Sequence, residues 1–150
     1  TIMKELHLWA TEGSTSHRSG AEFPFRLIPR RSNNFMNSTG RNISRLHGSR
    51  TWNPAFIHPE DLDRLGIERG AVVRLRSHWD QIDAIVEPDP TLRPGVIAMT
   101  HGFGGLPGQE ARFRELGSNT GRLLNTEVDF DPYTGMPRMS NVPVAVDVLP

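Results

Sequence analysis

The sequence of 150 residues contains no cysteine. This absence excludes a disulfide framework, a thiolate nucleophile, a zinc ribbon and an iron–sulfur cluster held by this chain. Reducing and oxidising compartments both accept a cysteine-free domain, so cytoplasmic and periplasmic locations stay open.

An excess of either charge is also missing, since 17 Lys and Arg residues balance 17 Asp and Glu residues. Without a net positive field the chain has little with which to hold a phosphate polymer, which argues against a nucleic-acid-binding protein. The sequence also lacks a run of about 18 apolar residues, so we expect no membrane insertion. Apolar residues make up 36% and charged residues 23%, which is typical of one soluble globular domain.

Glycine and proline are abundant, at 14 and 12 residues, and they divide the chain into short segments. Alternating or continuous apolar residues predict strands at 25–28, 55–57, 72–77, 81–87, 96–99 and 142–148. Pro59 at a first helical position, acidic residues after it and Gly66 at the end predict a short helix. Weaker signals indicate helical turns at 42–46 and 109–116. Short strands with one clear helix and many turns are typical of a barrel-like β domain.

The first 22 residues include a polar stretch rich in Gly, Ser and Thr at 11–16, which is typical of a mobile linker. We therefore expect residues 1–22 to be a flexible segment and residues 23–150 to form the domain. Because the chain starts at Thr1 without an initiator methionine, we also expect it to be a piece of a larger protein.

Common catalytic motifs are missing. The six histidines show no metal-ligand spacing, and no serine lies in a Gly-x-Ser-x-Gly elbow. The acidic residues Glu60, Asp61 and Asp63 are explained by the start of the predicted helix, where negative charge complements the positive end of the helix dipole. The glycine-rich stretch 102–108 lacks the Lys-Ser/Thr of a phosphate-binding loop, so turn formation explains it better than ligand binding. Glycine there would still let the backbone lie close to a flat ring.

Asparagine is the most informative residue type. The predicted loops contain most of the set Asn33, Asn34, Asn37, Asn42, Asn53, Asn119 and Asn125. An uncharged amide offers two donors and an acceptor, which suits the edges of a purine or pterin ring without the desolvation cost of a charge. Asparagine also favours turns for local reasons, so the residues alone leave both explanations open.

Several segments, taken in order along the chain, resemble one known pattern. They are residues 24–28, Arg31 with Asn37-Ser38 and Asn42, 53–61, 65–75, 92–96, His101-Gly102, and Asn125 with 131–137. The set resembles the molybdopterin-dinucleotide-binding domain that ends the catalytic subunit of the dimethyl-sulfoxide-reductase superfamily of molybdenum and tungsten oxidoreductases. The resemblance covers about residues 23–148, and the Pro-Glu-Asp…Leu-Gly-Ile…Gly…Val unit that starts at Pro59 is its strongest part.

The resemblance implies a mainly β fold, namely a double-psi β-barrel of the aspartate-decarboxylase type with one or two short helices. It implies molybdopterin guanine dinucleotide as the cofactor, with molybdenum or tungsten ligated by another domain. The partners would be the remaining domains or the catalytic subunit of the oxidoreductase. The chain alone would cover the cofactor like a lid and would not turn over substrate.

Carried over by position, the resemblance implies eight cofactor-binding residues and no catalytic or metal-ligating residue. Arg31, Asn37, Ser38 and Asn42 are expected along a loop that faces the pterins, Asn53 and Asn125 are expected to hydrogen-bond pterin or guanine edges, and His101 and Gly102 are expected to close over the cofactor. Gly102 would permit close approach.

Two other functions stay open. A stand-alone double-psi barrel would serve as an adaptor or peptide-binding module, with the asparagines as ordinary turn residues. A small decarboxylase on a related barrel would need a self-processing Gly-Ser site, and only Gly13-Ser14 and Gly48-Ser49 precede the barrel signals. Convergence of the asparagines and His101 on one face would favour the cofactor-binding domain, whereas scatter around the barrel would favour the adaptor.

Overall fold

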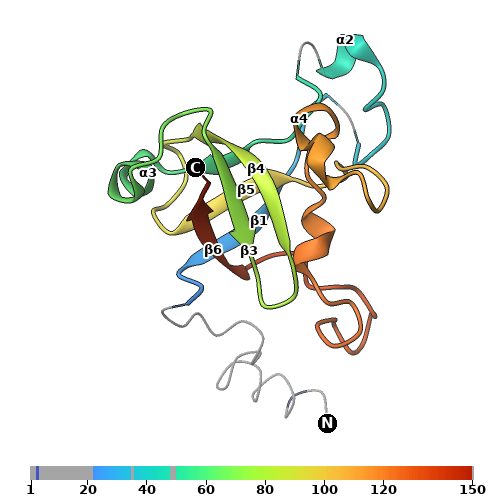
Figure 1. Cartoon of the computed structure of the whole chain (residues 1–150). Coiled ribbons are helices and arrows are strands. Elements are labelled where there is room, and N and C mark those ends of the chain that lie inside the picture. Colours follow the sequence, from blue (N-terminus) through green and yellow to red (C-terminus); the bar gives the residue numbers. More distant parts are fainter. Residues whose placement is uncertain (1–2, 4–21, 35, 48–49, 150) are drawn as a thin grey trace.

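The backbone forms a closed barrel of six strands (Figure 1). The structure is a computed structural model, and it describes residues 3, 22–34, 36–47 and 50–149. The strands are β1 (Phe25–Arg30), β2 (Ala55–Ile57), β3 (Val72–Arg76), β4 (Gln81–Pro88), β5 (Val96–Thr100) and β6 (Val142–Val148). Around the barrel they follow the order β1-β5-β2-β4-β3-β6, and β6 pairs with β1 to close it. The mainly β barrel implied by the resemblance is confirmed, and all six strands fall where the sequence predicts them.

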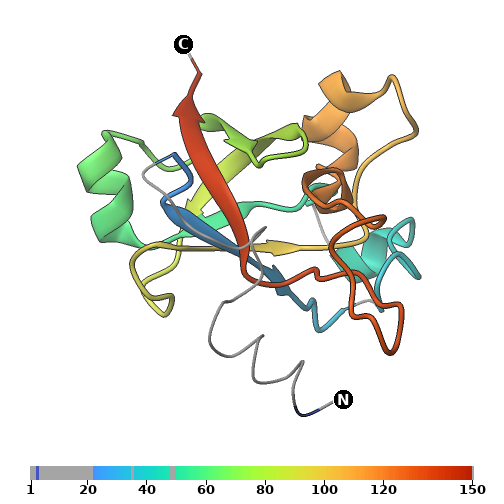
Figure 2. The ribbon, with the colours of Figure 1, turned by 90° about the horizontal axis from the view of Figure 1, so that it is seen from below.

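Parallel and antiparallel pairs both occur in the barrel. β1 runs parallel to β5, with Arg30 opposite Thr100, and β2 runs parallel to β4. The other neighbouring pairs are antiparallel. Two parallel neighbours end at the same end of a barrel, and Figure 2 shows β1 and β5 both running towards one end.

Apolar side chains fill the barrel because successive residues of a strand point to opposite faces. Phe25 and Leu27 are buried in β1, and Val73 and Leu75 are buried in β3. The core consists of Phe25, Leu27, Ala55, Ile57, Leu62, Ile67, Val73, Leu75, Ile82, Ala84, Val86, Ile97, Met99, Leu123, Val142 and Val144. A small barrel packed in this way leaves ligand binding to the loops at its ends.

The helix α3 (Pro59–Leu65) begins and ends where the sequence predicts, and Gly66 follows it at φ 67°. Besides complementing the helix dipole, Asp61 makes specific hydrogen bonds. Its buried carboxylate accepts hydrogen bonds from Arg64 at 2.5 Å and from the N–H of Gly95 at 2.6 Å. Asp61 therefore joins α3 to the turn before β5, at the end of the barrel where β1 and β5 begin.

The remaining helices lie at the other end, away from α3 (Figure 2). They are α2 (Ser44–His47), the 3-10 helix η2 (Glu110–Arg112), α4 (Phe113–Leu116) and the 3-10 helix η3 (Thr120–Leu123). The helical turns predicted at 42–46 and 109–116 are confirmed within two residues. No signal in the sequence predicted η3.

Some predictions fall outside the described residues. The predicted flexible segment 1–22 does so except for residues 3 and 22, and so do both candidate Gly-Ser pairs. The domain boundary at residue 22 therefore stays a prediction. Over the ranges that the structure does describe, no helix has the length and apolar character needed to cross a bilayer.

Asp89 ties the end of β4 to β1. Its carboxylate accepts hydrogen bonds from Arg30 at 2.5 Å and from the hydroxyl and N–H of Thr91 at 2.6 and 2.9 Å. The Thr91 hydroxyl, the Arg30 guanidinium and the Thr91 N–H hold the pKa of Asp89 at about 2.

We predict that Asp89 makes the stability of the barrel depend on pH in acid. Its folded pKa of about 2 lies below the ordinary value of 3.8, so its stabilisation is present above about pH 4 and is lost as the pH falls towards 2. Asp89→Asn should lower the free energy of unfolding at neutral pH by about 1.5–3 kcal/mol. Urea unfolding of both proteins at several pH values between about 7 and 2 measures the difference. A difference that stays constant down to pH 2 would contradict the prediction.

Candidate functional site

Two loops leave the barrel side by side because β1 and β5 are parallel and end together. Arg30 lies opposite Thr100, so Arg31 and His101 are the first residues of adjacent loops. The resemblance selected both residues, and the strand topology now gives a physical reason for their proximity.

Asn37 links the two loops through its side-chain oxygen. Oδ1 accepts a hydrogen bond from Nη1 of Arg31 at 3.2 Å and lies 2.8 Å from Nε2 of His101. Arginine can only donate, so the Asn37 atom that faces both partners is the oxygen, and Nε2 of His101 carries a proton. In the neutral ring Nδ1 is then an acceptor. Nδ1 is buried, and it has no hydrogen-bond partner within the described ranges.

Gly102 lets the second loop lie directly against the first. Its φ is 82°, and a Cβ there would come within 2.9 Å of the carbonyl carbon of Asn37 and 3.0 Å of the nitrogen of Ser38. Within the chain, the close approach that Gly102 permits is therefore to the backbone of the neighbouring loop.

Arg41 holds the same segment from the other loop, and no motif in the sequence marks it. Its Nη1 donates to the carbonyl of Gly102 at 2.5 Å and its Nη2 donates to the carbonyl of Gly104 at 3.2 Å. The guanidinium carbon lies 5.3 Å from the centre of the Phe103 ring. These partners are 61 and 63 positions away in the sequence, so local spacing could not predict the contact. We call Arg31, Asn37, Ser38, Arg41, His101 and Gly102 the loop cluster.

Asn53 lies behind the loop cluster and is only 2% exposed. Its Nδ2 donates to the carbonyls of Thr100 at 2.7 Å and Ser118 at 3.0 Å, and its Oδ1 accepts from the N–H of Ser118 at 2.7 Å. Both donors and the acceptor of the amide are engaged by the chain. Asn53 thus anchors the turn at 117–118 to the end of β5, directly before His101.

The other two predicted residues make no hydrogen bond to the loop cluster within the part of the chain that the structure describes. Asn42 is exposed in the turn before α2. The Oδ1 of Asn125 accepts from the N–H of Glu127 at 2.8 Å, as in a local turn. Leu124 and His101 nevertheless line one small cavity of about 10 Å³, so the segment before Asn125 packs against the loop cluster. Contacts therefore bring together Arg31, Asn37, Ser38, His101 and Gly102, with Asn53 behind them.

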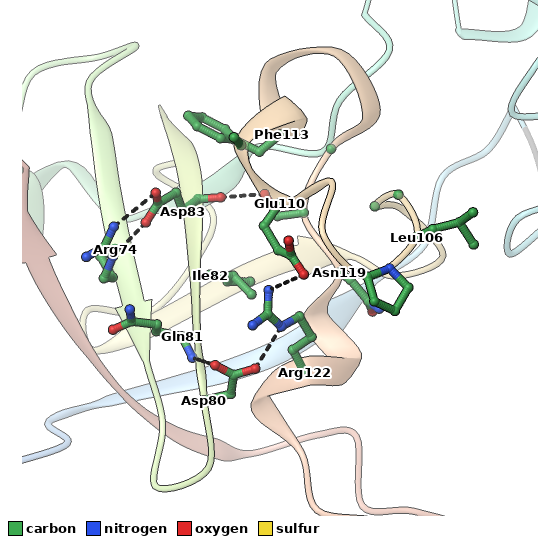
Figure 3. A pocket seen from close by; sticks show the side chains of 16 residues that line it. Arg74, Asp80, Gln81, Ile82, Asp83, Leu106, Glu110, Phe113, Asn119 and Arg122 are labelled. Carbon is green, nitrogen blue, oxygen red and sulfur yellow. Dashed lines mark hydrogen bonds and ion pairs between the residues drawn. The ribbon is translucent and has the colours of Figure 1, made fainter.

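A cleft of about 720 Å³ adjoins the loop cluster at Gly104 (Figure 3). The β3–β4 hairpin forms one side and the segment 104–122 forms the other. Its charged side chains are Arg74, Asp80, Asp83, Glu110 and Arg122. All five are paired, because Arg74 binds Asp83 at 2.8 and 3.2 Å and Arg122 lies between the other two carboxylates.

Arg122 closes this charge network across the cleft. It donates to Asp80 at 2.7 Å and to Glu110 at 3.1 Å. Burial raises the pKa of Asp80, but the N–H of Gln81 and the Arg122 guanidinium outweigh burial and lower this pKa below its ordinary value. Asp80 is therefore a carboxylate at neutral pH and holds Arg122 in place.

The loop cluster contains cations and neutral polar groups but no carboxylate. Arg31 and Arg41 carry positive charge, and Asn37, Ser38 and His101 offer further polar donors and acceptors. Such a set suits an anionic group joined to a flat polar ring. Over residues 22–34, 36–47 and 50–149, no group of three or more His, Asp or Glu side chains is arranged to hold a metal ion.

Comparison with known proteins agrees with a site for an anionic group joined to a flat polar ring. The family model described as "Molydopterin dinucleotide binding domain" matches residues 25–143. A tetrathionate reductase subunit from Salmonella typhimurium is 32% identical over 111 residues, which make up 74% of this chain and 10% of that protein. The corresponding tetrathionate reductase subunit from Archaeoglobus fulgidus is 30% identical over 84 residues, or 56% of this chain and 7% of that protein.

The fold is also similar to a solved structure. Acetylene hydratase from Pelobacter acetylenicus matches with a TM-score of 0.70 and 17% identity, over 99% of this chain and 20% of that one. At this identity the match shows a shared fold. The chain spans about a tenth or less of the length of the tetrathionate reductase subunits that it matches.

Replacement of Gly102 by alanine should destabilise the chain more than replacement of Gly70. Both glycines have φ of 82°, so the left-handed strain of about 1–2 kcal/mol is common to both variants. Only at Gly102 does the added Cβ meet a neighbour, the backbone of Asn37, whereas nothing lies within 4 Å at Gly70. We expect Gly102→Ala to lower the free energy of unfolding by at least about 1 kcal/mol more than Gly70→Ala. Equal losses in urea unfolding would show that the two loops do not pack as described.

A second prediction separates the buried asparagine from an exposed one. Asn53→Ala leaves the carbonyls of Thr100 and Ser118 and one N–H without their partner, and should lower the free energy of unfolding by about 2–4 kcal/mol. Asn42→Ala, in an exposed turn, should change it by less than about 0.5 kcal/mol. Thermal and urea unfolding of the two variants measure the contrast, and a small effect of Asn53→Ala would argue against its internal role.

Proposed function

Since the chain belongs to the family of molybdopterin dinucleotide-binding domains, we propose that its loop cluster contacts the pterin and guanosine parts of a molybdopterin guanine dinucleotide. The resemblance to this domain of the dimethyl-sulfoxide-reductase superfamily, a family of oxidoreductases, is confirmed. The residue-level contacts and the parts of the cofactor that they touch are our proposal.

Convergence of Arg31, Asn37 and His101 at the ends of two parallel strands is the observation that carries this proposal. The chemistry of these groups fits the cofactor. Amide and imidazole groups match the donors and acceptors of a pterin or guanine edge, and the guanidinium groups match the charge of a pyrophosphate. No carboxylate of the loop cluster opposes that charge.

The cofactor, when bound, supplies the redox chemistry of a metal that another domain ligates. This chain then binds, orients and shields it. Asn37 holds the Arg31 and His101 side chains in one arrangement before the cofactor arrives, so that the remaining donors of Arg31 need not reorganise on binding. Asn53 supports them from behind by fixing the end of β5. On this proposal the chain alone does not turn over substrate, and its partner is the remainder of the oxidoreductase, in keeping with the much greater length of its relatives.

A stand-alone adaptor or peptide-binding module is the alternative. It predicts asparagines scattered in ordinary turns, and the local turn at Asn125 agrees with it. The contact between Asn37 and His101 and the position of Asn53 against Thr100 favour the cofactor-binding domain instead.

Titration of the isotopically labelled chain with guanosine diphosphate, and separately with pterin, tests the proposal by nuclear magnetic resonance. Resonances of Asn37, Ser38, His101 and Gly102 should shift together and saturate. Since the isolated chain offers only part of the pocket, we expect dissociation constants of about 1 mM or weaker.

Two variants make this titration specific. Asn37→Ala and His101→Ala should each weaken binding by about tenfold, or about 1.4 kcal/mol. His58→Ala at the start of α3, at the other end of the barrel, should leave the affinity unchanged. Shifts centred on α3, or an affinity that none of the loop-cluster variants alters, would contradict the proposal.

A further inference from the structure

We infer that Arg41 is a positioning residue, which orients the backbone of the glycine-rich segment 102–105 so that its amide groups face away from Arg41. The geometry stands by itself, and only the identity of the ligand rests on the proposed function. Neither a sequence motif nor the resemblance assigns a role to Arg41.

The guanidinium of Arg41 donates to two backbone carbonyls that lie two residues apart in the chain. Nη1 and Nη2 donate to Gly102 at 2.5 Å and Gly104 at 3.2 Å, and the guanidinium lies against the ring of Phe103 between them. A guanidinium is planar and rigid, so two simultaneous hydrogen bonds fix both the spacing and the direction of the two carbonyls.

Fixing a carbonyl also fixes the next N–H. No peptide bond among the described residues is cis, and in a trans peptide the C=O and the following N–H point in opposite directions. The carbonyls held by Arg41 share their peptide planes with the N–H groups of Phe103 and Gly105, which are therefore directed away from Arg41. Gly105 lines the 720 Å³ cleft, so a donor of fixed direction lies at the rim of that cleft.

The segment needs such a clamp because it contains three glycines in four residues. Glycine loses more conformational freedom on ordering than any other residue. Gly104 is at φ 101°, and its N–H donates to the carbonyl of Leu116 at 2.9 Å. A Cβ on Gly104 would come within 2.7 Å of the Cβ of Asn119. Arg41 from one side and the segment 116–119 from the other thus hold the loop in a single conformation.

A different role for Arg41 would be to attract an anionic ligand by charge alone. The two roles separate in Arg41→Lys, which keeps the charge but cannot reach two carbonyls with a planar fork. Arg41→Gln removes both the charge and the fork. Arg45→Gln is the matched control, since Arg45 is an exposed arginine on the neighbouring helix α2.

The first measurement needs no ligand. Amide hydrogen exchange of Gly104, whose N–H is hydrogen-bonded to Leu116, should accelerate by about tenfold in Arg41→Lys and Arg41→Gln when followed by nuclear magnetic resonance. Exchange in β3 and β4 should stay unchanged in these variants, which excludes general unfolding. Arg45→Gln should behave as the wild type throughout. Unchanged exchange at Gly104 in both Arg41 variants would overturn the inference, whether or not a ligand binds.

The second measurement titrates guanosine diphosphate into the chain. Separate titrations with guanosine and with inorganic pyrophosphate show which part of the nucleotide is recognised. Both Arg41 variants should reduce the shift of the Gly105 amide and weaken binding by about fivefold or more. Wild-type affinity in Arg41→Lys would assign Arg41 to charge attraction and overturn positioning. If exchange accelerates as expected while no probe binds the wild type, the positioning role is supported and the proposed function fails.

Discussion

The parallel pairing of β1 with β5 is the constraint on which the rest of the site depends. In an antiparallel pair, the residues that follow the two strands lie at opposite ends, whereas β1 and β5 release their loops together. The interior of the barrel is filled by apolar side chains, which leaves its ends for binding. One end is closed by α3, where Asp61 binds the turn before β5. The loop cluster, α2 and the segment 104–122 occupy the other end (Figure 2).

The loops at this end are held by contacts between backbone and polar side chains. Gly102 permits contact between the two loops, and Arg41 fixes the carbonyls of the second loop. Asn53 fixes the turn behind them, and Asn37 sets which nitrogen of His101 carries its proton. Groups fixed before a ligand arrives lose little freedom when it binds, which is what a domain that covers and orients a cofactor requires.

Local patterns in the sequence predicted the strands and the main helix. Features of the site that depend on long-range contacts could not be predicted from it. Alternating or continuous apolar residues predicted all six strands, and Pro59 with Gly66 bounded α3, because these signals act over a few residues. The resemblance selected most of the loop cluster. It could not separate the internal amide of Asn53 from the exposed amide of Asn42, since burial is decided by the fold. Arg41 was missed because its partners lie more than 60 positions away.

A structure of this chain bound to molybdopterin guanine dinucleotide, within the longer oxidoreductase that we propose contains it, tests the central claim most directly. We predict pterin or guanosine atoms in contact with the side chains of Asn37 and His101, at the end of the barrel where β1 and β5 finish. A cofactor bound against α3, or one that leaves the loop cluster facing solvent, would contradict this claim.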